Sequence, residues 1–198
     1  MLAGKKSHQV NRWRKFYLGS GSLAKNFLNF NWDRQFTTKT FRPQFPYTSM
    51  NNHLILEDNW TGAEGSNAEG IPVMVRYRQN LRGFIDSGYY PTKIEIHWKY
   101  DTDEASEMPA SGEADIIDNF ETALIYALEG DRQSILTSVI TGQGEKRWAW
   151  YTSNADSAQE RIDTVLLDFE QLPITITKTE DPNWDDYFAF IADFGGAA

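Results

Sequence analysis

The segment from Ser134 to Thr152 constrains the fold more than any other part of the chain. Its first half is mostly aliphatic or β-branched and contains no proline, which predicts a strand. Gly142-Gln143-Gly144 supplies the permissive backbone of a tight reversal, and the returning strand has aromatic side chains at alternate positions. Trp148 and Trp150 therefore share one face, and the other face holds Arg147, Ala149 and Tyr151. A two-stranded ribbon is only marginally stable in water, so other elements must cover this hairpin.

The remaining apolar patterns predict those other elements. Alternation predicts strands at Ile71–Arg78, Lys93–Tyr100 and Ile174–Thr179, besides the hairpin strands Ser134–Thr141 and Lys146–Thr152. Apolar spacing of three and four predicts amphipathic helices at Ala114–Glu129 and Ala158–Leu172, and Asp181-Pro182 begins a short aromatic helix at Asn183–Phe194. Thr61–Gly70, which is rich in glycine, alanine and glutamate, reads as a loop.

From residue 93 the predicted order is strand, helix, strand, strand, helix, strand. We therefore expect an α+β fold, a ferredoxin-like βαββαβ sandwich with an extra N-terminal strand and a short C-terminal helix. In that topology the first strand already has two neighbours. The strand Ile71–Arg78 must then lie at an edge, or else the strand order differs, and the sequence leaves both open.

Charge divides the chain into two parts. Residues 1–49 hold nine Lys and Arg and one acid, Asp33, which gives +8, whereas residues 50–198 hold ten basic and 27 acidic residues, which gives −17. We expect a basic, aromatic extension outside the fold over 1–49 and an acidic α+β domain over 50–198. Residues 1–49 also fit a basic arm that lies on the acidic domain or on a nucleic acid, or an arginine-rich transit peptide.

The chain contains no cysteine, which excludes disulfides and thiolate metal sites. No apolar run approaches the roughly 20 residues of a membrane-spanning helix, and residues near the N-terminus lack the apolar region of a signal peptide. We therefore expect a cytoplasmic protein without membrane association.

The end of the chain resembles a known bacterial family. Arg147-Trp148-Ala149-Trp150-Tyr151 is followed by an amphipathic helix, Ile174-Thr175-Ile176 and the segment Glu180-Asp181-Pro182-Asn183-Trp184-Asp185-Asp186-Tyr187. This combination resembles domain of unknown function 695 (DUF695), over about Asn59 to Phe194 and without Met1–Ser49. The family is similar to the regulator of ribonuclease E, type B, which implies a ferredoxin-like fold. The resemblance implies no known catalytic residue.

Candidate chemistry is sparse in this sequence. We expect no catalytic residue, no metal and no cofactor. His97 lies on the polar side of its strand, which is typical of a surface residue. An acidic patch is predicted from carboxylates near the starts of two helices, where acids also favour the helix dipole: Asp115, Asp118, Glu121, Asp181, Asp185 and Asp186.

The tryptophan pair leaves two alternatives open. Trp148 and Trp150 either pack beneath the helices or form an exposed stacking platform, as in RNA-binding ferredoxin-like domains. We favour the core, because a domain of charge −17 repels phosphates.

Two functional hypotheses follow. The first is a non-catalytic interaction or regulatory module that binds a basic surface of a protein partner, such as an RNA-processing enzyme, or acts as an immunity-type protein, without binding nucleic acid through the acidic domain. The alternative is an enzyme or a small-ligand-binding protein. Its site, which could equally be a partner surface, would lie on an open sheet face lined by Glu95, His97, Arg147, Tyr151, Thr175 and Thr177. The sequence leaves the oligomeric state undetermined.

Overall fold

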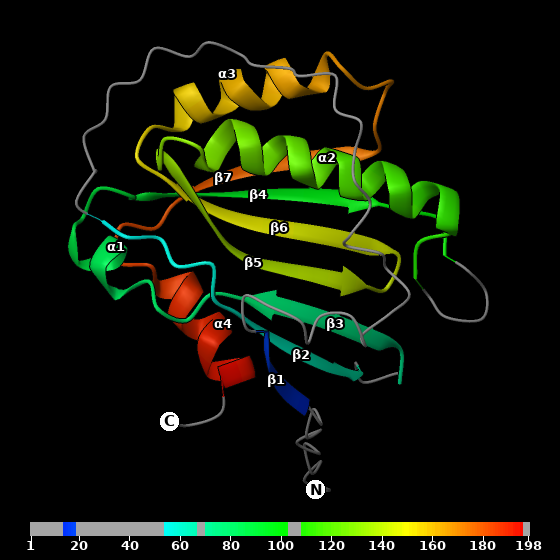
Figure 1. Ribbon diagram of the computed structural model, residues 1–198, viewed down its shortest axis with the longest axis horizontal. Helices are drawn as coiled ribbons and strands as arrows, with labels where there is room; N and C mark the ends of the chain where they lie inside the picture. Colours follow the sequence, from blue (N-terminus) through cyan, green and yellow to red (C-terminus); the bar gives the residue numbers. More distant parts are fainter. Residues whose placement is uncertain (1–13, 19–53, 67–69, 103–107, 196–198) are drawn as a thin grey trace, which may run out of the picture.

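The computed structural model describes residues 14–18, 54–66, 70–102 and 108–195 (Figure 1). Within these residues the chain forms a sheet whose neighbouring strands are all antiparallel, in the order β1-β2-β3-β5-β6-β4-β7. In chain order the elements are β1 (Arg14–Leu18), β2 (Trp60–Ser66), β3 (Pro72–Tyr77), α1 (Arg82–Asp86), β4 (Thr92–Lys99), α2 (Ser111–Glu129), β5 (Ser134–Gly142), β6 (Glu145–Thr152), α3 (Ala155–Leu166), β7 (Ile174–Glu180) and α4 (Asp185–Gly195). The fold is α+β, as predicted.

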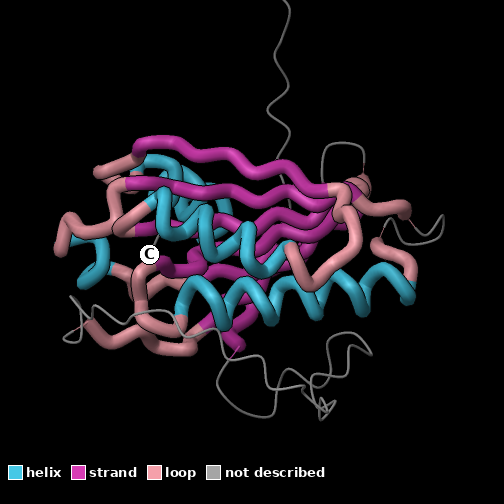
Figure 2. The backbone as a smooth tube through the Cα atoms, turned by 90° about the horizontal axis from the view of Figure 1, so that it is seen from above, coloured by secondary structure: helices cyan, strands magenta, loops and turns pink. Residues whose placement is uncertain are grey.

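Helices α2 and α3 lie side by side over one face of the sheet, which we call the helix face (Figure 1, Figure 2). Alternate side chains of β4, among them Ile96 and Trp98, point towards these helices. Trp148 and Trp150 of β6 belong to the same core and are both 0% exposed, which confirms the interpretation that they pack beneath the helices. Burying each indole removes roughly 200 Å² from water, worth about 5 kcal/mol.

Helices α1 and α4 cover one end of the opposite face, which we call the second face (Figure 1). Phe84 of α1 meets Tyr90 edge to face, with ring centroids 5.6 Å apart. Phe190 of α4 meets Tyr77 of β3 in the same way at 5.7 Å. The sheet therefore has apolar clusters on both faces, and only part of the second face is open.

The segment Trp60–Ser66 is a strand, so the expectation of a loop at Thr61–Gly70 is wrong over Thr61–Ser66, and residues 67–69 lie outside the described residues. β2 pairs with β3 from Thr61 opposite Tyr77 to Ser66 opposite Pro72. Its small residues Gly62 and Ala63 are buried. Backbone hydrogen bonds to the neighbouring strands hold β2 in place. Its glycine and alanine residues give no alternating apolar pattern from which a strand could be predicted. β3 then lies between β2 and β5, which settles the open question: the predicted strand Ile71–Arg78 adds beyond β5 and is not an edge of the sheet.

Helix α3 ends at Leu166, six residues before the predicted end at Leu172. The backbone amides of Leu167, Asp168 and Phe169 each donate to the carbonyl three residues earlier, so the chain tightens after the helix. This turn brings the ring of Phe169 to 5.4 Å from that of Phe120 in α2, nearly perpendicular to it. Packing of an aromatic side chain therefore replaces the last predicted turn of helix.

The backbone of β1 pairs with β2 from Arg14 opposite Glu64 to Leu18 opposite Trp60. The rest of the segment 1–49 lies outside the described residues. The prediction that 1–49 is an extension outside the acidic domain of 50–198 therefore stays a prediction.

Candidate functional site

Five of the six residues predicted for an open sheet face lie together on the uncovered part of the second face. His97 of β4 lies between Arg147 of β6 and Thr175 of β7, and Glu95 lies between Ala149 and Thr177. With Glu145 they form a group that we call the sheet strip: Glu95, His97, Glu145, Arg147, Thr175 and Thr177. Both threonines are exposed and the other four are half-buried.

Glu145 links the charged members of the sheet strip. Its Oε1 lies 2.9 Å from Nδ1 of His97, and its Oε2 lies 3.7 Å from Nε of Arg147. A carboxylate that orients an imidazole is part of many general-base sites. A nucleophile in reach is the other part, and within the described residues no hydrogen bond joins His97 to Thr175 or Thr177. The strip therefore brings a carboxylate, an imidazole and a guanidinium together on one face of the sheet.

The sixth predicted residue, Tyr151, is not on an open surface. Its ring stacks on the indole of Trp184 with centroids 3.8 Å apart and planes inclined by 12°. Its hydroxyl donates to Oδ2 of Asp181 at 2.5 Å, and the residue is 1% exposed. Burial and the neighbouring Asp181 carboxylate raise the pKa of Tyr151 above its ordinary value. The prediction failed because α4 folds back over this end of β6.

Asp181 has a structural role in placing α4. Its carboxylate accepts from the backbone amides of Asp185 at 2.7 Å and Asp186 at 3.1 Å, which satisfies free donors at the start of the helix. Trp184, which has a positive φ of 59°, donates from its indole to the carbonyl of Tyr90 at 3.0 Å. The acidic-Pro-x-Trp segment therefore attaches α4 to the second face.

The α2 members of the predicted acidic patch have different surroundings. Glu121 is buried at 4% exposure, where its carboxylate accepts from the Arg76 guanidinium, from Nζ of Lys146 at 3.0 Å and from the indole of Trp148 at 2.7 Å. Although burial opposes it, the charges of Arg76 and Lys146 lower the pKa of Glu121 from 4.5 to about 2. Asp118 is half-buried, and burial raises its pKa despite Lys146 at 3.4 Å.

The six predicted carboxylates therefore do not form one acidic patch. Asp115, Asp118 and Glu121 belong to α2, over the helix face, and Asp181 precedes α4, over the second face. Glu121 and Asp181 are buried, whereas Asp185 and Asp186 are exposed, and Asp186 lies 2.5 Å from Nζ of Lys93.

Sequence reasoning missed a charged seam between α2 and β3. Besides the pair of Arg76 and Glu121, Arg78 lies 2.5 Å from Oε1 of Glu129 and donates to the carbonyl of Leu136 at 3.0 Å. The ring of Trp60 lies against both guanidinium groups, with its centroid 4.8 Å from Cζ of Arg76 and 4.3 Å from Cζ of Arg78. Both arginines follow the polar alternation of their strand, but nothing in that pattern names α2 as their partner.

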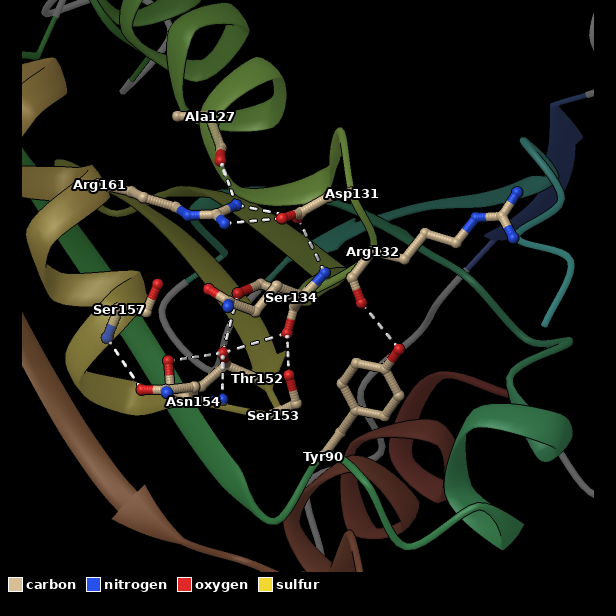
Figure 3. Close-up of polar contacts among 11 residues, drawn as sticks. Tyr90, Ala127, Asp131, Arg132, Ser134, Thr152, Ser153, Asn154, Ser157 and Arg161 are labelled. Carbon is tan, nitrogen blue, oxygen red and sulfur yellow. Dashed lines mark hydrogen bonds and ion pairs between the residues drawn. The ribbon is translucent and has the colours of Figure 1, made fainter. Parts of the chain in front are cut away.

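A second network that the sequence did not predict joins the end of α2 to α3 (Figure 3). Arg161 of α3 donates to both carboxylate oxygens of Asp131, at 2.9 and 2.7 Å, and to the carbonyl of Ala127 at 3.0 Å. Nearby, Asn154 accepts from the amide of Ser157 at 2.9 Å and caps α3. The hydrogen bonds of Arg161 and Asn154 satisfy groups at the end of α2, in the turn after it and at the start of α3, so we assign this network to the fold.

The exposed charged side chains of the described domain are mostly acidic. Among the residues described from 54 onwards, the exposed basic ones are Arg82, Lys99 and Lys178. The exposed acidic ones are Glu57, Asp58, Asp86, Asp101, Asp115, Asp156, Glu160, Asp163, Asp168, Glu170, Glu180, Asp185, Asp186 and Asp193. Cations such as Arg76, Arg78 and Arg161 are instead buried or half-buried in ion pairs with carboxylates. In the folded domain most basic side chains are therefore paired away from solvent, and the exposed charge is mainly negative.

Two kinds of feature are absent from the described ranges. No cluster of three or more His, Asp or Glu side chains there could hold a metal ion. None of the helices described there has both the length and the apolar character needed to cross a bilayer.

Comparison with known proteins gives one family. The sequence model of a family described as "Family of unknown function (DUF695)" matches residues 58–192, which is more than half of the chain. No curated protein and no solved structure matches the chain. The matched range begins just before β2 and ends within α4, so it includes the strands β2 to β7 and the helices between them.

Proposed function

The chain belongs to the DUF695 family, whose function is unknown, and we propose that its acidic domain is a non-catalytic interaction module for a protein partner with a basic surface. The observation that carries this proposal is the division of charge between the interior and the surface. Basic side chains of the domain are drawn into pairs such as Arg76 with Glu121 and Arg161 with Asp131, while the exposed acids have few basic neighbours. Complementary charge of this kind speeds association and selects partners.

The same negative charge keeps the module from binding nucleic acid, because it repels phosphates. The module would therefore bind the basic surface of a nucleic-acid-binding partner without binding that partner's nucleic acid itself. We propose an RNA-processing enzyme, or a toxin in an immunity-type pair, as the partner class. We also propose that the protein acts in the cytoplasm.

We further propose that β4 to β7 form a ferredoxin-like unit related to the regulator of ribonuclease E, type B. The support is topological. In chain order this part is β4, α2, β5, β6, α3, β7, and its strand order across the sheet is β5-β6-β4-β7. Each helix thus connects two strands that have a third, antiparallel strand between them.

A capture experiment tests the proposed function. The full chain is immobilised, and proteins retained from a cell extract at low and at moderate salt are identified by mass spectrometry. We expect a specific basic partner that is retained at low salt and released at moderate salt, because exposed charge pairs are screened. A variant with Asp156→Asn, Glu160→Gln and Asp163→Asn on the exposed side of α3 should retain less of it. A partner whose retention does not change with salt would contradict the proposal.

A second candidate function rests on the sheet strip. Glu145 contacts both His97 and Arg147 and holds the imidazole and the guanidinium close together on the sheet. Both groups can donate hydrogen bonds to a small polar ligand. In a screen of small anions and zwitterions by thermal shift, Arg147→Ala and His97→Ala should remove any stabilisation that the native chain shows. Stabilisation that survives both substitutions would exclude this site.

A further inference from the structure

Strand β7 has one neighbour within the described part of the chain. It is last in the strand order and pairs with β4 from Ile174 opposite Trp98 to Glu180 opposite Thr92. At the other side of the sheet the last described strand is β1, which pairs with β2. β7 is therefore one of the two edge strands of the described sheet.

The hydrogen-bond register shows which backbone groups of β7 face outward. Beyond the two ends of the strand, the amide of Lys99 donates to the carbonyl of Pro173 at 3.1 Å and the amide of Asp181 donates to the carbonyl of Pro91 at 2.8 Å. In an antiparallel pair, hydrogen-bonded residues alternate with residues whose amide and carbonyl point away from the partner. The residues of β7 at odd positions therefore bond to β4, and the outward residues are Ile174, Ile176, Lys178 and Glu180. The amide of Ile174 already donates to the carbonyl of Leu172 at 2.9 Å, so the outward amides that an added strand would use are those of Ile176, Lys178 and Glu180.

The side chains leave this edge accessible. All residues from Thr177 to Glu180 are exposed, as is Thr175, and the strand contains neither proline nor glycine. Ile174 and Ile176 are partly buried against the core beneath α2 and α3, so they provide an apolar margin on the helix face. A row of free donors and acceptors beside an apolar margin is what an added strand requires.

We propose that β7 accepts an extended segment of a protein partner as an additional strand of the sheet, and that this segment carries basic side chains. The basic character rests on the proposed function. It is also supported locally, because the exposed charges of β7 and of the connection before it are three acids, Asp168, Glu170 and Glu180, against one cation, Lys178. The apolar margin at Ile174 and Ile176 predicts small aliphatic residues at alternate positions of the segment.

A second copy of the chain fits this edge less well. If two β7 strands paired antiparallel over their full length through the outward residues, Ile176 of one copy would lie opposite Lys178 of the other. The two Lys178 side chains would then be diagonal neighbours on the same face, and like charges at such positions are unfavourable. Lysine on an exposed edge is a known protection against self-association. We therefore assign the edge to a different protein.

Amide hydrogen exchange measured by NMR on the full chain tests the proposal. The probe is a short peptide that alternates valine with arginine, and its control alternates valine with glutamate. On adding the arginine peptide, the outward amides of Ile176, Lys178 and Glu180 should become protected. The amides of the odd-numbered residues, already bonded to β4, should change little. This alternation is specific to strand addition and is not expected of side-chain contact alone.

A matched pair of variants removes one outward amide. Lys178→Pro deletes the outward N–H without breaking a bond to β4, whereas Lys178→Ala removes the same charge and keeps the N–H. The proline variant should bind the peptide about tenfold more weakly than the alanine variant, because it loses one hydrogen bond to the added strand and its ring also hinders that strand. If the proline variant does not fold, an arginine peptide N-methylated at its bonding positions makes the same comparison on the native chain.

The outcomes separate this inference from the proposed function. Protection of the outward residues by the arginine peptide alone supports both. Binding of the arginine peptide without protection in β7 overturns the edge inference and leaves the interaction module standing. Equal protection by both peptides supports strand addition but contradicts the requirement for basic side chains, and with it the proposed function. Absence of binding by either peptide overturns the edge inference.

Discussion

Neutralising Glu121 should destabilise the protein by an amount that depends on pH. This carboxylate lies between α2 and the sheet, where it accepts from the Arg76 guanidinium, from Lys146 at 3.0 Å and from the indole of Trp148 at 2.7 Å. Glu121→Gln keeps the shape and removes the charge. Since it leaves two cations without their shared anion, we expect a lower free energy of unfolding at neutral pH.

The magnitude follows from the pKa of the carboxyl. Folding lowers the pKa of Glu121 from 4.5 to about 2, and each pKa unit corresponds to about 1.4 kcal/mol, so the charge stabilises the fold by about 3 kcal/mol at pH 7. Because the pKa in the folded state is the lower one, this stability is complete above about pH 4.5 and is lost as the pH falls towards 2. About 1.4 kcal/mol should remain at pH 3. The raised pKa of Asp118 acts in the opposite direction; burial is its main cause and the charge of Glu121 adds to it, so part of this opposing contribution is lost in Glu121→Gln.

Urea unfolding followed by tryptophan fluorescence measures this difference. The native chain and Glu121→Gln are compared at pH 7 and at pH 3, and the two free energies of unfolding are subtracted at each pH. Because protonated glutamate resembles glutamine, the difference should fall to less than half between pH 7 and pH 3. An equal difference in the free energy of unfolding at pH 7 and pH 3 would refute the reasoning, since it would show that the charge of Glu121 does not stabilise the fold.

The remaining predictions concern the hairpin turn, the attachment of α4, and the ion pair and cap of α3. Each is measured as a free energy of unfolding in urea. Gly142→Ala should destabilise more than Gly144→Ala, because a Cβ at 142 would lie 2.6 Å from a backbone oxygen whereas at 144 its nearest neighbour is 3.6 Å away; equal losses would contradict this. Trp184→Ala should cost about 3 kcal/mol or more through the cavity that it leaves beside α4, and a loss below about 1 kcal/mol would mean that α4 is not attached as described. Arg161→Met should cost about 3 kcal/mol, because the Asp131 carboxylate loses its bidentate partner; an unchanged stability would show that the pair is dispensable. Asn154→Ala should cost about 1 kcal/mol through loss of the α3 cap, and restoration by serine at the same position would confirm the cause.

The sequence predicts the elements of the fold where one residue pattern decides them. The alternation of Lys93–Tyr100 gives β4 to within a residue at each end, and the spacing of Ala114–Glu129 gives the end of α2. The hairpin turn between Gly142 and Glu145 has positive φ at its two central residues, 61° at Gln143 and 72° at Gly144, as a type I′ turn requires. These features depend on neighbours in the sequence, which is why a single chain reveals them.

The missed features depend on partners that are distant in the sequence. β2 is a strand because β1 and β3 pair with its backbone, and its glycine and alanine residues carry little information about that. Tyr151 is buried because Trp184, which follows two further elements, returns to stack on it. The pairs of Arg76 with Glu121 and of Arg161 with Asp131 likewise join separate elements. The candidate site was therefore predicted where it follows strand register, as for His97 and Arg147, and not where α4 covers it.

The central claim is that the exposed acids bind a basic protein surface, and a titration tests it most directly. The full chain is titrated calorimetrically with the valine–arginine peptide and with the valine–glutamate peptide, each over a series of salt concentrations. The account predicts binding of the arginine peptide that weakens steadily as salt is added, and none of the glutamate peptide. Equal binding of the two peptides, or an affinity for the arginine peptide that does not change with salt, would contradict it.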